Sequence, residues 1–93
     1  MLKKELVVRA ATGLHARPAA NFVELASRYD SEIKVHFGDK EVNAKSIISV
    51  LSLGLGQGES FVLTVEGPDE KEALTELEKY IQEELNGEKE RSK

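Results

Sequence analysis

The interleaving of strand patterns with helix patterns constrains the fold of this 93-residue chain more than any other feature of its sequence. Strand patterns cover four segments, which are residues 2–10, 32–37, 40–43 and 60–66. In the last segment, Phe61, Leu63 and Val65 occupy every second position and therefore share one face of a strand. The pair Gly38-Asp39, between the second and third segments, is a typical signal for a two-residue hairpin turn.

Helix patterns occupy the stretches between these strands. The first begins at Pro18, which suits an opening helical turn, and should end near Tyr29-Asp30. Its apolar residues recur at helical spacing and are Ala19, Phe22, Val23 and Ala26. A short second helix should start after Ser46, because serine is a favourable N-cap that is worth about 1 kcal/mol.

A third helix pattern follows Gly67-Pro68. Asp69 and Glu72 are spaced as in a capping box, so we expect both to cap the start of this helix. Its buried stripe is predicted to consist of Leu74, Leu77, Ile81 and Leu85. The helix should end at Asn86-Gly87, which leaves a charged tail over residues 88–93 that we expect to fray.

These patterns together predict an α+β fold. Each strand has a single apolar face and the helices carry matching apolar stripes, so a two-layer open-faced sandwich satisfies all of them. In this sandwich a four-stranded antiparallel sheet is covered on one face by three helices, in the order β-α-β-β-α-β-α, and the other face meets solvent. The chain is short enough for one domain, which we place at residues 1–87.

The composition argues against several classes of function. The net charge is −4 and no basic cluster precedes the C-terminal tail, which disfavours a nucleic-acid-binding protein. The sequence has no cysteine, and no apolar run approaches the roughly 18 residues of a membrane span. An N-terminal signal peptide is not recognisable either. We therefore expect a cytoplasmic monomer that binds neither nucleic acid nor a membrane and needs no metal or cofactor.

The segment Gly13-Leu14-His15-Ala16-Arg17-Pro18 is the most informative for function. It places His15 at the mouth of the first predicted helix, where free backbone N–H groups and the helix dipole attract anions. Arg17 is close enough in sequence to reach a phosphate on the imidazole as a charge-assisted donor. These features indicate a histidine that carries a phosphoryl group; the alternative is an ordinary loop or N-cap histidine.

Other positions have both a structural and a functional interpretation. Ser46 is a predicted N-cap, and because the helix dipole would favour a phosphate there, it is also a candidate regulatory phosphoserine. The next apolar residues either pack into the core or form an exposed patch for a protein partner. They are Ile47, Ile48 and Leu51. His36 is predicted to be solvated on the outer face of a strand, and since nothing places it beside His15, no metal site is expected.

Two motifs resemble those of HPr, the histidine-containing phosphocarrier family of the bacterial sugar phosphotransferase system. They are Gly13-Leu14-His15-Ala16-Arg17-Pro18-Ala19 and Asn43-Ala44-Lys45-Ser46-Ile47, and the resemblance covers about residues 2–87. It implies that His15 accepts a phosphoryl group at Nδ1 from phosphorylated enzyme I and passes it to sugar-specific enzyme IIA domains. Arg17 would stabilise the phosphate. A protein of this kind is a stoichiometric carrier and not an enzyme.

The same resemblance implies regulation and docking. Ser46 matches the serine that HPr kinase/phosphorylase phosphorylates with ATP, and in Gram-positive relatives the modified form binds the catabolite control protein as a corepressor. The partner-docking residues that the family implies are Thr12, Ala16, Ala20, Ile47, Ile48, Leu51 and Gly54. Ile48 and Leu51 stand where many members have methionine, and Ser49 stands where many have glycine.

Three alternatives stay open. A purely regulatory module on the same fold would act through Ser46, but such relatives lack the histidine that this chain has as His15. A carrier for a nitrogen-related phosphotransferase branch is the second alternative, and the Lys45-Ser46-Ile47 segment favours the sugar branch over it. A small metal- or RNA-binding α+β domain is the third, and the residue types and the net charge disfavour it.

Overall fold

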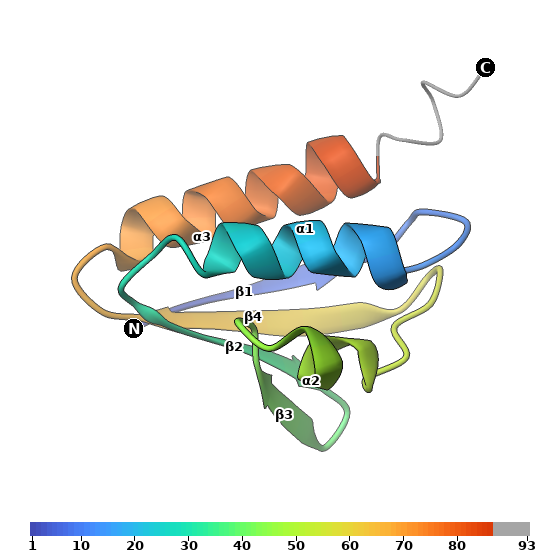
Figure 1. Ribbon diagram of the computed structural model, residues 1–93, viewed down its shortest axis with the longest axis horizontal. Coiled ribbons are helices and arrows are strands. Elements are labelled where there is room, and N and C mark those ends of the chain that lie inside the picture. Colours follow the sequence, from blue (N-terminus) through green and yellow to red (C-terminus); the bar gives the residue numbers. More distant parts are fainter. Residues whose placement is uncertain (87–93) are drawn as a thin grey trace.

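A computed structural model describes residues 1–86, and these form one antiparallel sheet with helices packed on it (Figure 1). The elements are β1 (Leu2–Val7), α1 (Ala16–Ala26), β2 (Glu32–Phe37), β3 (Lys40–Asn43), α2 (Ile47–Leu51), β4 (Ser60–Glu66), α3 (Glu70–Lys79) and the π-helical segment η1 (Tyr80–Leu85). The four strands are ordered β1-β4-β2-β3, and every neighbouring pair is antiparallel. The predicted fold class is confirmed. The predicted tail at 88–93 lies outside the described residues.

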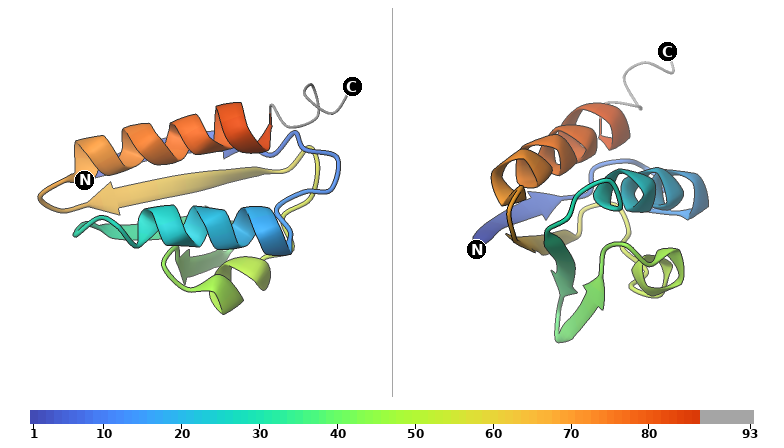
Figure 2. Two further views of the ribbon diagram at one scale, coloured as in Figure 1. Left: turned by 45° about the horizontal axis from the view of Figure 1, so that its top comes forward. Right: turned by 60° about the vertical axis from the view of Figure 1, so that its left-hand side comes forward.

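The helices all lie on one face of the sheet. Figure 2 shows α1 and α3 side by side across that face, and α2 packs against α1 and β3 at its border. The opposite face carries no helix in the part of the chain that the structure describes. The fold therefore offers two different surfaces, one built from helices and one built from the outward side chains of the strands.

The core lies between the sheet and α1 and α3. The inward residues of β4, which are Phe61, Leu63 and Val65, are buried as their spacing predicts. Phe22 of α1 is fully buried and packs at a tilted angle on Tyr80, with 6.5 Å between the ring centroids. On the last helix the predicted residues Leu77, Ile81 and Leu85 are buried, whereas Leu74 is only partly buried and Ala73 is fully buried beside it.

Several element ends differ from the sequence prediction. β1 ends at Val7, and the next residues leave the regular ladder, although Val8 still exchanges backbone hydrogen bonds with the loop before β4 at Gly58 and Glu59. α1 ends at Ala26, where Ser27 closes the final turn. The last helix widens into a π-helix from Tyr80 onward, a change that apolar spacing does not reveal.

The predicted capping box of Asp69 and Glu72 is wrong. Asp69 is the N-cap residue of α3, but its carboxylate does not cap the helix. It accepts hydrogen bonds from the backbone N–H of Asp30 at 2.9 Å, from the backbone N–H of Ser31 at 3.0 Å and from the Ser31 hydroxyl at 2.5 Å. Glu70 reaches back to the Gly67 N–H at 3.1 Å. The loop before β2 thus supplies donors that compete successfully with the helix end.

Replacing Asp69 with asparagine should therefore weaken the fold in a pH-dependent way. Hydrogen bonding, first from the Ser31 hydroxyl, lowers the pKa of Asp69, so its stabilising effect is present above the unfolded pKa near 3.9 and is lost as the pH falls through the lower folded value. Urea unfolding should show a deficit for Asp69→Asn at pH 7 that shrinks towards pH 2. Asp39→Asn, in the exposed β2–β3 turn, is the matched control. An equal deficit at both pH values would contradict this role.

Candidate functional site

His15 lies at the N-cap of α1 with its side chain exposed. Its backbone is extended, with φ −100° and ψ −166°, and its imidazole makes no capping hydrogen bond. The backbone carbonyl of His15 accepts from the Ala19 N–H at 2.8 Å, so the helix begins directly behind it. The N–H groups of Ala16 and Arg17 lie in the first turn of α1, where no preceding helical carbonyl accepts from them. This is a free imidazole beside free backbone donors.

Arg17 adds a positive charge to the same turn. It is exposed, and none of the ion pairs within residues 1–86 involves it. The first turn of α1 contains no acidic residue. The mouth of α1 is therefore locally cationic in a chain whose net charge is −4, an arrangement that stabilises an anionic group.

The loop before His15 is fixed by contacts from distant parts of the chain. Gly13 has a positive φ of 73°, and its N–H bonds to the Ala10 carbonyl at 2.9 Å. Leu14 is buried and donates its N–H to the Leu55 carbonyl at 3.0 Å. The sequence places His15 at the start of a helix but does not predict the hydrogen bond between Leu14 and Leu55, because no local pattern links these two segments.

A second support holds the first turn of α1. The Tyr80 hydroxyl donates a hydrogen bond to the Pro18 carbonyl at 3.1 Å. Asn86 supports the segment between β1 and the His15 loop. Its Nδ2 donates to the Val7 carbonyl at 2.8 Å, and its Oδ1 accepts from the Arg9 N–H at 2.7 Å. The end of the last helix is thus joined both to α1 and to the strand that leads into the His15 loop.

Ser46 is the N-cap of α2, as predicted. Its hydroxyl oxygen accepts from the Ser49 N–H at 3.3 Å, and the residue is half-buried. The turn in front of it is well fixed, because the Asn43 side chain accepts from the Lys45 N–H at 2.8 Å and Lys45 Nζ donates to the Tyr29 carbonyl at 2.6 Å. The segment that leads into Ser46 is therefore held in place by side-chain hydrogen bonds.

The structure separates the apolar residues of α2 into two groups. Ile47 is partly buried against the core, whereas Ile48 is 78% exposed and Leu51 is 39% exposed. With Met1, these two are the large hydrophobic residues that the described chain leaves exposed. The remaining predicted docking residues, Thr12, Ala16, Ala20 and Gly54, are all exposed. Since α1 and α2 pack against each other, Ile48 and Leu51 lie on a helix that adjoins the His15 helix (Figure 1).

His36 differs from its prediction. It lies on the outer face of β2, as expected, but it is half-buried and not simply solvated. Its Nε2 is 3.0 Å from the Thr64 hydroxyl and its Nδ1 is 3.7 Å from a carboxylate oxygen of Glu41. The cause is the strand register, which sets His36 opposite Glu41 on β3. Within residues 1–86 no group of three or more His, Cys, Asp or Glu side chains is placed to hold a metal ion.

None of the helices formed by the described residues has the length and apolar character needed to cross a membrane.

Known proteins resemble this chain over most of its length. A family model described as "PTS HPr component phosphorylation site" matches residues 2–83. The HPr-like protein Crh of Halalkalibacterium halodurans is 46% identical over 84 residues, which are 90% of this chain and 100% of Crh. The phosphocarrier protein HPr of Buchnera aphidicola subsp. Acyrthosiphon pisum is 44% identical over 77 residues, which are 83% of this chain and 91% of that protein.

Solved structures of HPr proteins also resemble this chain in fold and sequence. The crystal structure of HPr-C-His from Thermoanaerobacter tengcongensis matches with a TM-score of 0.88 and 45% identity, covering 91% of this chain and 96% of that one. An HPr dimer from the same organism matches with a TM-score of 0.73 and 45% identity, covering 88% and 97%. The fold, the matched residues and both groups of relatives lead to one conclusion: this chain belongs to the HPr family of phosphotransferase-system phosphocarriers.

Proposed function

We propose that this chain carries a phosphoryl group on His15, taking it from phosphorylated enzyme I and delivering it to sugar-specific enzyme IIA domains. The observation that supports this most directly is the exposed imidazole of His15 at the N-cap of α1, which has no capping bond to give up. An enzyme active site usually encloses its substrate, whereas this histidine is accessible to a protein partner. The carrier domain is proposed to span residues 1–87.

In the proposed transfer, the lone pair of His15 Nδ1 attacks the phosphorus atom of the donor. A new N–P bond forms while the bond between phosphorus and the donor breaks, and its electron pair stays with the donor. Negative charge spreads over the phosphoryl oxygens in the loose transition state. The Ala16 and Arg17 N–H groups and the Arg17 guanidinium are proposed to stabilise that charge. The reverse sequence at an enzyme IIA domain empties the carrier.

The direct test is incubation of the full chain with enzyme I and radiolabelled phosphoenolpyruvate, followed by mapping of the label. Acid-labile phosphate at Nδ1 of His15 is the expected result.

Arg17→Gln should slow phosphoryl transfer without affecting stability. A charge-assisted hydrogen bond is worth about 1.5–3 kcal/mol, so rapid-quench kinetics with phosphorylated enzyme I should show a rate about 10 to 100 times lower. Arg17 is exposed and unpaired within residues 1–86, so the free energy of unfolding should change by less than about 0.5 kcal/mol. The control is Arg28→Gln, at the other end of α1. Equal rates for the two variants would remove Arg17 from the site.

Ser46 is proposed to be a regulatory phosphorylation site. Its hydroxyl caps α2 from a half-buried residue, and its modified form is proposed to bind a catabolite control protein. With ATP and HPr kinase/phosphorylase, the chain should acquire acid-stable phosphate, and Ser46→Ala should acquire none. Ser52→Ala, at the other end of the same helix, should be labelled as well as the wild type. Label remaining in Ser46→Ala would assign the modification to another residue.

A purely regulatory role is the second candidate, because the chain is 46% identical to an HPr-like protein Crh. His15 distinguishes the two, since the carrier needs an accepting histidine. The Lys45-Ser46-Ile47 segment supports the sugar branch over a nitrogen-related branch. We propose a cytoplasmic protein that works as a monomer and docks its partners through Ile48, Leu51 and the exposed residues of α1.

A further inference from the structure

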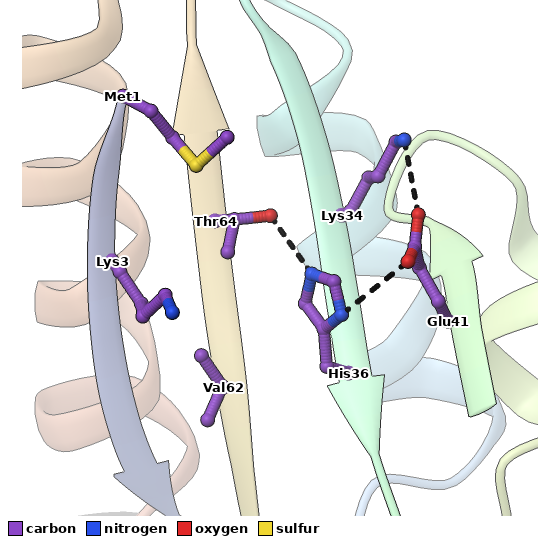
Figure 3. Close-up of a pocket in the computed structure, with 7 residues that line it drawn as sticks. All are labelled: Met1, Lys3, Lys34, His36, Glu41, Val62 and Thr64. Atoms are coloured by element: carbon purple, nitrogen blue, oxygen red, sulfur yellow. Dashed lines mark hydrogen bonds and ion pairs between the residues drawn. The ribbon is translucent and has the colours of Figure 1, made fainter. Parts of the chain in front are cut away.

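The open face of the sheet carries a hollow of about 540 Å³ (Figure 3). Its lining comes from all four strands and from the N-terminal residue, and consists of Met1, Lys3, Lys34, His36, Glu41, Val62 and Thr64. The strand register produces this grouping, because Lys3 and Lys34 both lie opposite Thr64. Volumes of roughly 300–1,000 Å³ are typical of sites for small molecules. The helices that carry His15 and Ser46 pack on the other face.

Of the cationic groups that line this hollow, the Met1 N-terminus and Lys34 have ion-pair partners among the described residues and Lys3 has none. Lys34 Nζ lies 3.0 Å from a Glu41 carboxylate oxygen and 3.7 Å from one of Glu32, so this lysine is already paired. The hydrogen bond from Lys34 lowers the pKa of Glu41 and keeps it ionised. Lys3, by contrast, forms no ion pair with any described residue. One unpaired ammonium group thus remains in a hollow of a chain whose net charge is −4.

The remaining lining is suited to the body of a small molecule. Figure 3 shows Lys3 and His36 on either side of Val62 and Thr64, with the imidazole ring between β2 and β4 and directed towards the Thr64 hydroxyl. The ring is held in position, since Nε2 is 3.0 Å from the Thr64 hydroxyl and Nδ1 is 3.7 Å from Glu41. Val62 and the Met1 side chain provide apolar surface next to it. A cation, a fixed flat ring and an apolar floor therefore share one concave surface.

We propose that this hollow binds a small organic anion, with the anionic head group on Lys3 and an apolar or ring-shaped body on Val62, Met1 and the face of His36. The charge complementarity of Lys3 selects an anion over a cation, and the apolar floor selects an organic anion over an inorganic one. Carboxylates and phosphate esters share the required head-group chemistry. The site is separate from the phosphoryl-accepting histidine and would let the protein respond to a metabolite.

NMR titration of the ¹⁵N-labelled full chain tests the proposal with three probes of one shape: benzoate, phenyl phosphate and benzyl alcohol. Saturable shifts should appear at the amides of Lys3, His36, Val62 and Thr64, and the amides of His15 and Arg17 should stay in place. At least one anion should bind ten times more tightly than the alcohol, and the tighter anion identifies the preferred head group. Equal affinity for the alcohol, or shifts that do not saturate at millimolar concentrations, would overturn the proposal.

Variants separate a specific site from general charge effects. Lys3→Gln should weaken binding of the anion about tenfold, and Lys3→Arg should restore most of it. Lys71→Gln removes the same charge from the exposed surface of α3, outside this hollow, and should leave the affinity unchanged. Equal losses in Lys3→Gln and Lys71→Gln would mean that the anion responds only to net charge, and would refute the site.

Discussion

Replacing His15 with alanine should abolish phosphoryl acceptance from enzyme I and phosphoenolpyruvate while leaving the fold intact. The imidazole is exposed and makes no capping hydrogen bond, so the fold does not depend on it. The free energy of unfolding should therefore change by less than about 0.5 kcal/mol. Incorporation of acid-labile label should fall to background, because the variant lacks the imidazole nitrogen that is proposed to accept the phosphoryl group.

His36→Gln is the matched control, since it removes the second histidine of the chain from the opposite face of the sheet. This variant should accept label at the wild-type rate. Acid-labile phosphate persisting in His15→Ala, or disappearing in His36→Gln, would contradict the assignment of His15 as the accepting residue.

Gly13→Ala should destabilise the fold much more than Gly38→Ala does. The backbone of Gly13 has φ 73°, and an added Cβ would lie 2.7 Å from the Leu55 carbonyl oxygen and 2.9 Å from Gly56 Cα. Both atoms belong to backbone and cannot rotate away. Positive φ and steric overlap together should cost about 2–4 kcal/mol, measured by urea unfolding. Phosphorylation should slow as well, because the same contact positions the loop that ends at His15.

Gly38→Ala separates the two causes. Its φ is 64°, but an added Cβ there has no atom within 4 Å. Only the backbone strain should remain, which amounts to about 1–2 kcal/mol for an L-residue in the left-handed region. If Gly13→Ala and Gly38→Ala lost equal stability, the close contact between the Gly13 loop and the loop of Leu55 and Gly56 would not contribute to the free energy of unfolding.

Local patterns are sufficient for much of this fold. The alternation of Phe61, Leu63 and Val65 predicts a half-buried strand, and the structure buries all three. Ser46 satisfies the donor of a residue three positions later, so its cap is also visible in the sequence. The position of His15 at the start of its helix could be predicted because Pro18 marks the first turn, and the structure places His15 at the N-cap of α1. In each case the interacting groups are near neighbours along the chain.

Interactions between distant segments could not be predicted in this way. The sequence predicts that Asp69 caps its own helix, but its hydrogen-bond partners Asp30 and Ser31 lie in another loop. The hollow on the open face requires the strand order β1-β4-β2-β3, and the same apolar alternation is compatible with other orders. The sequence therefore does not predict that Lys3 of β1 and His36 of β2 line the same hollow on either side of β4.

The hydrogen bond from Tyr80 to the Pro18 carbonyl has a consequence for how a loaded carrier is recognised. Together with the hydrogen bonds of Asn86 to Val7 and Arg9, it connects the segments before and after His15 to the last helix. We expect these ties to preserve one shape in the empty and the loaded forms of the proposed carrier, which would then differ in charge. Partners that distinguish the two forms would then respond to the electrostatic potential at the helix mouth, and we expect their discrimination to weaken as the ionic strength rises.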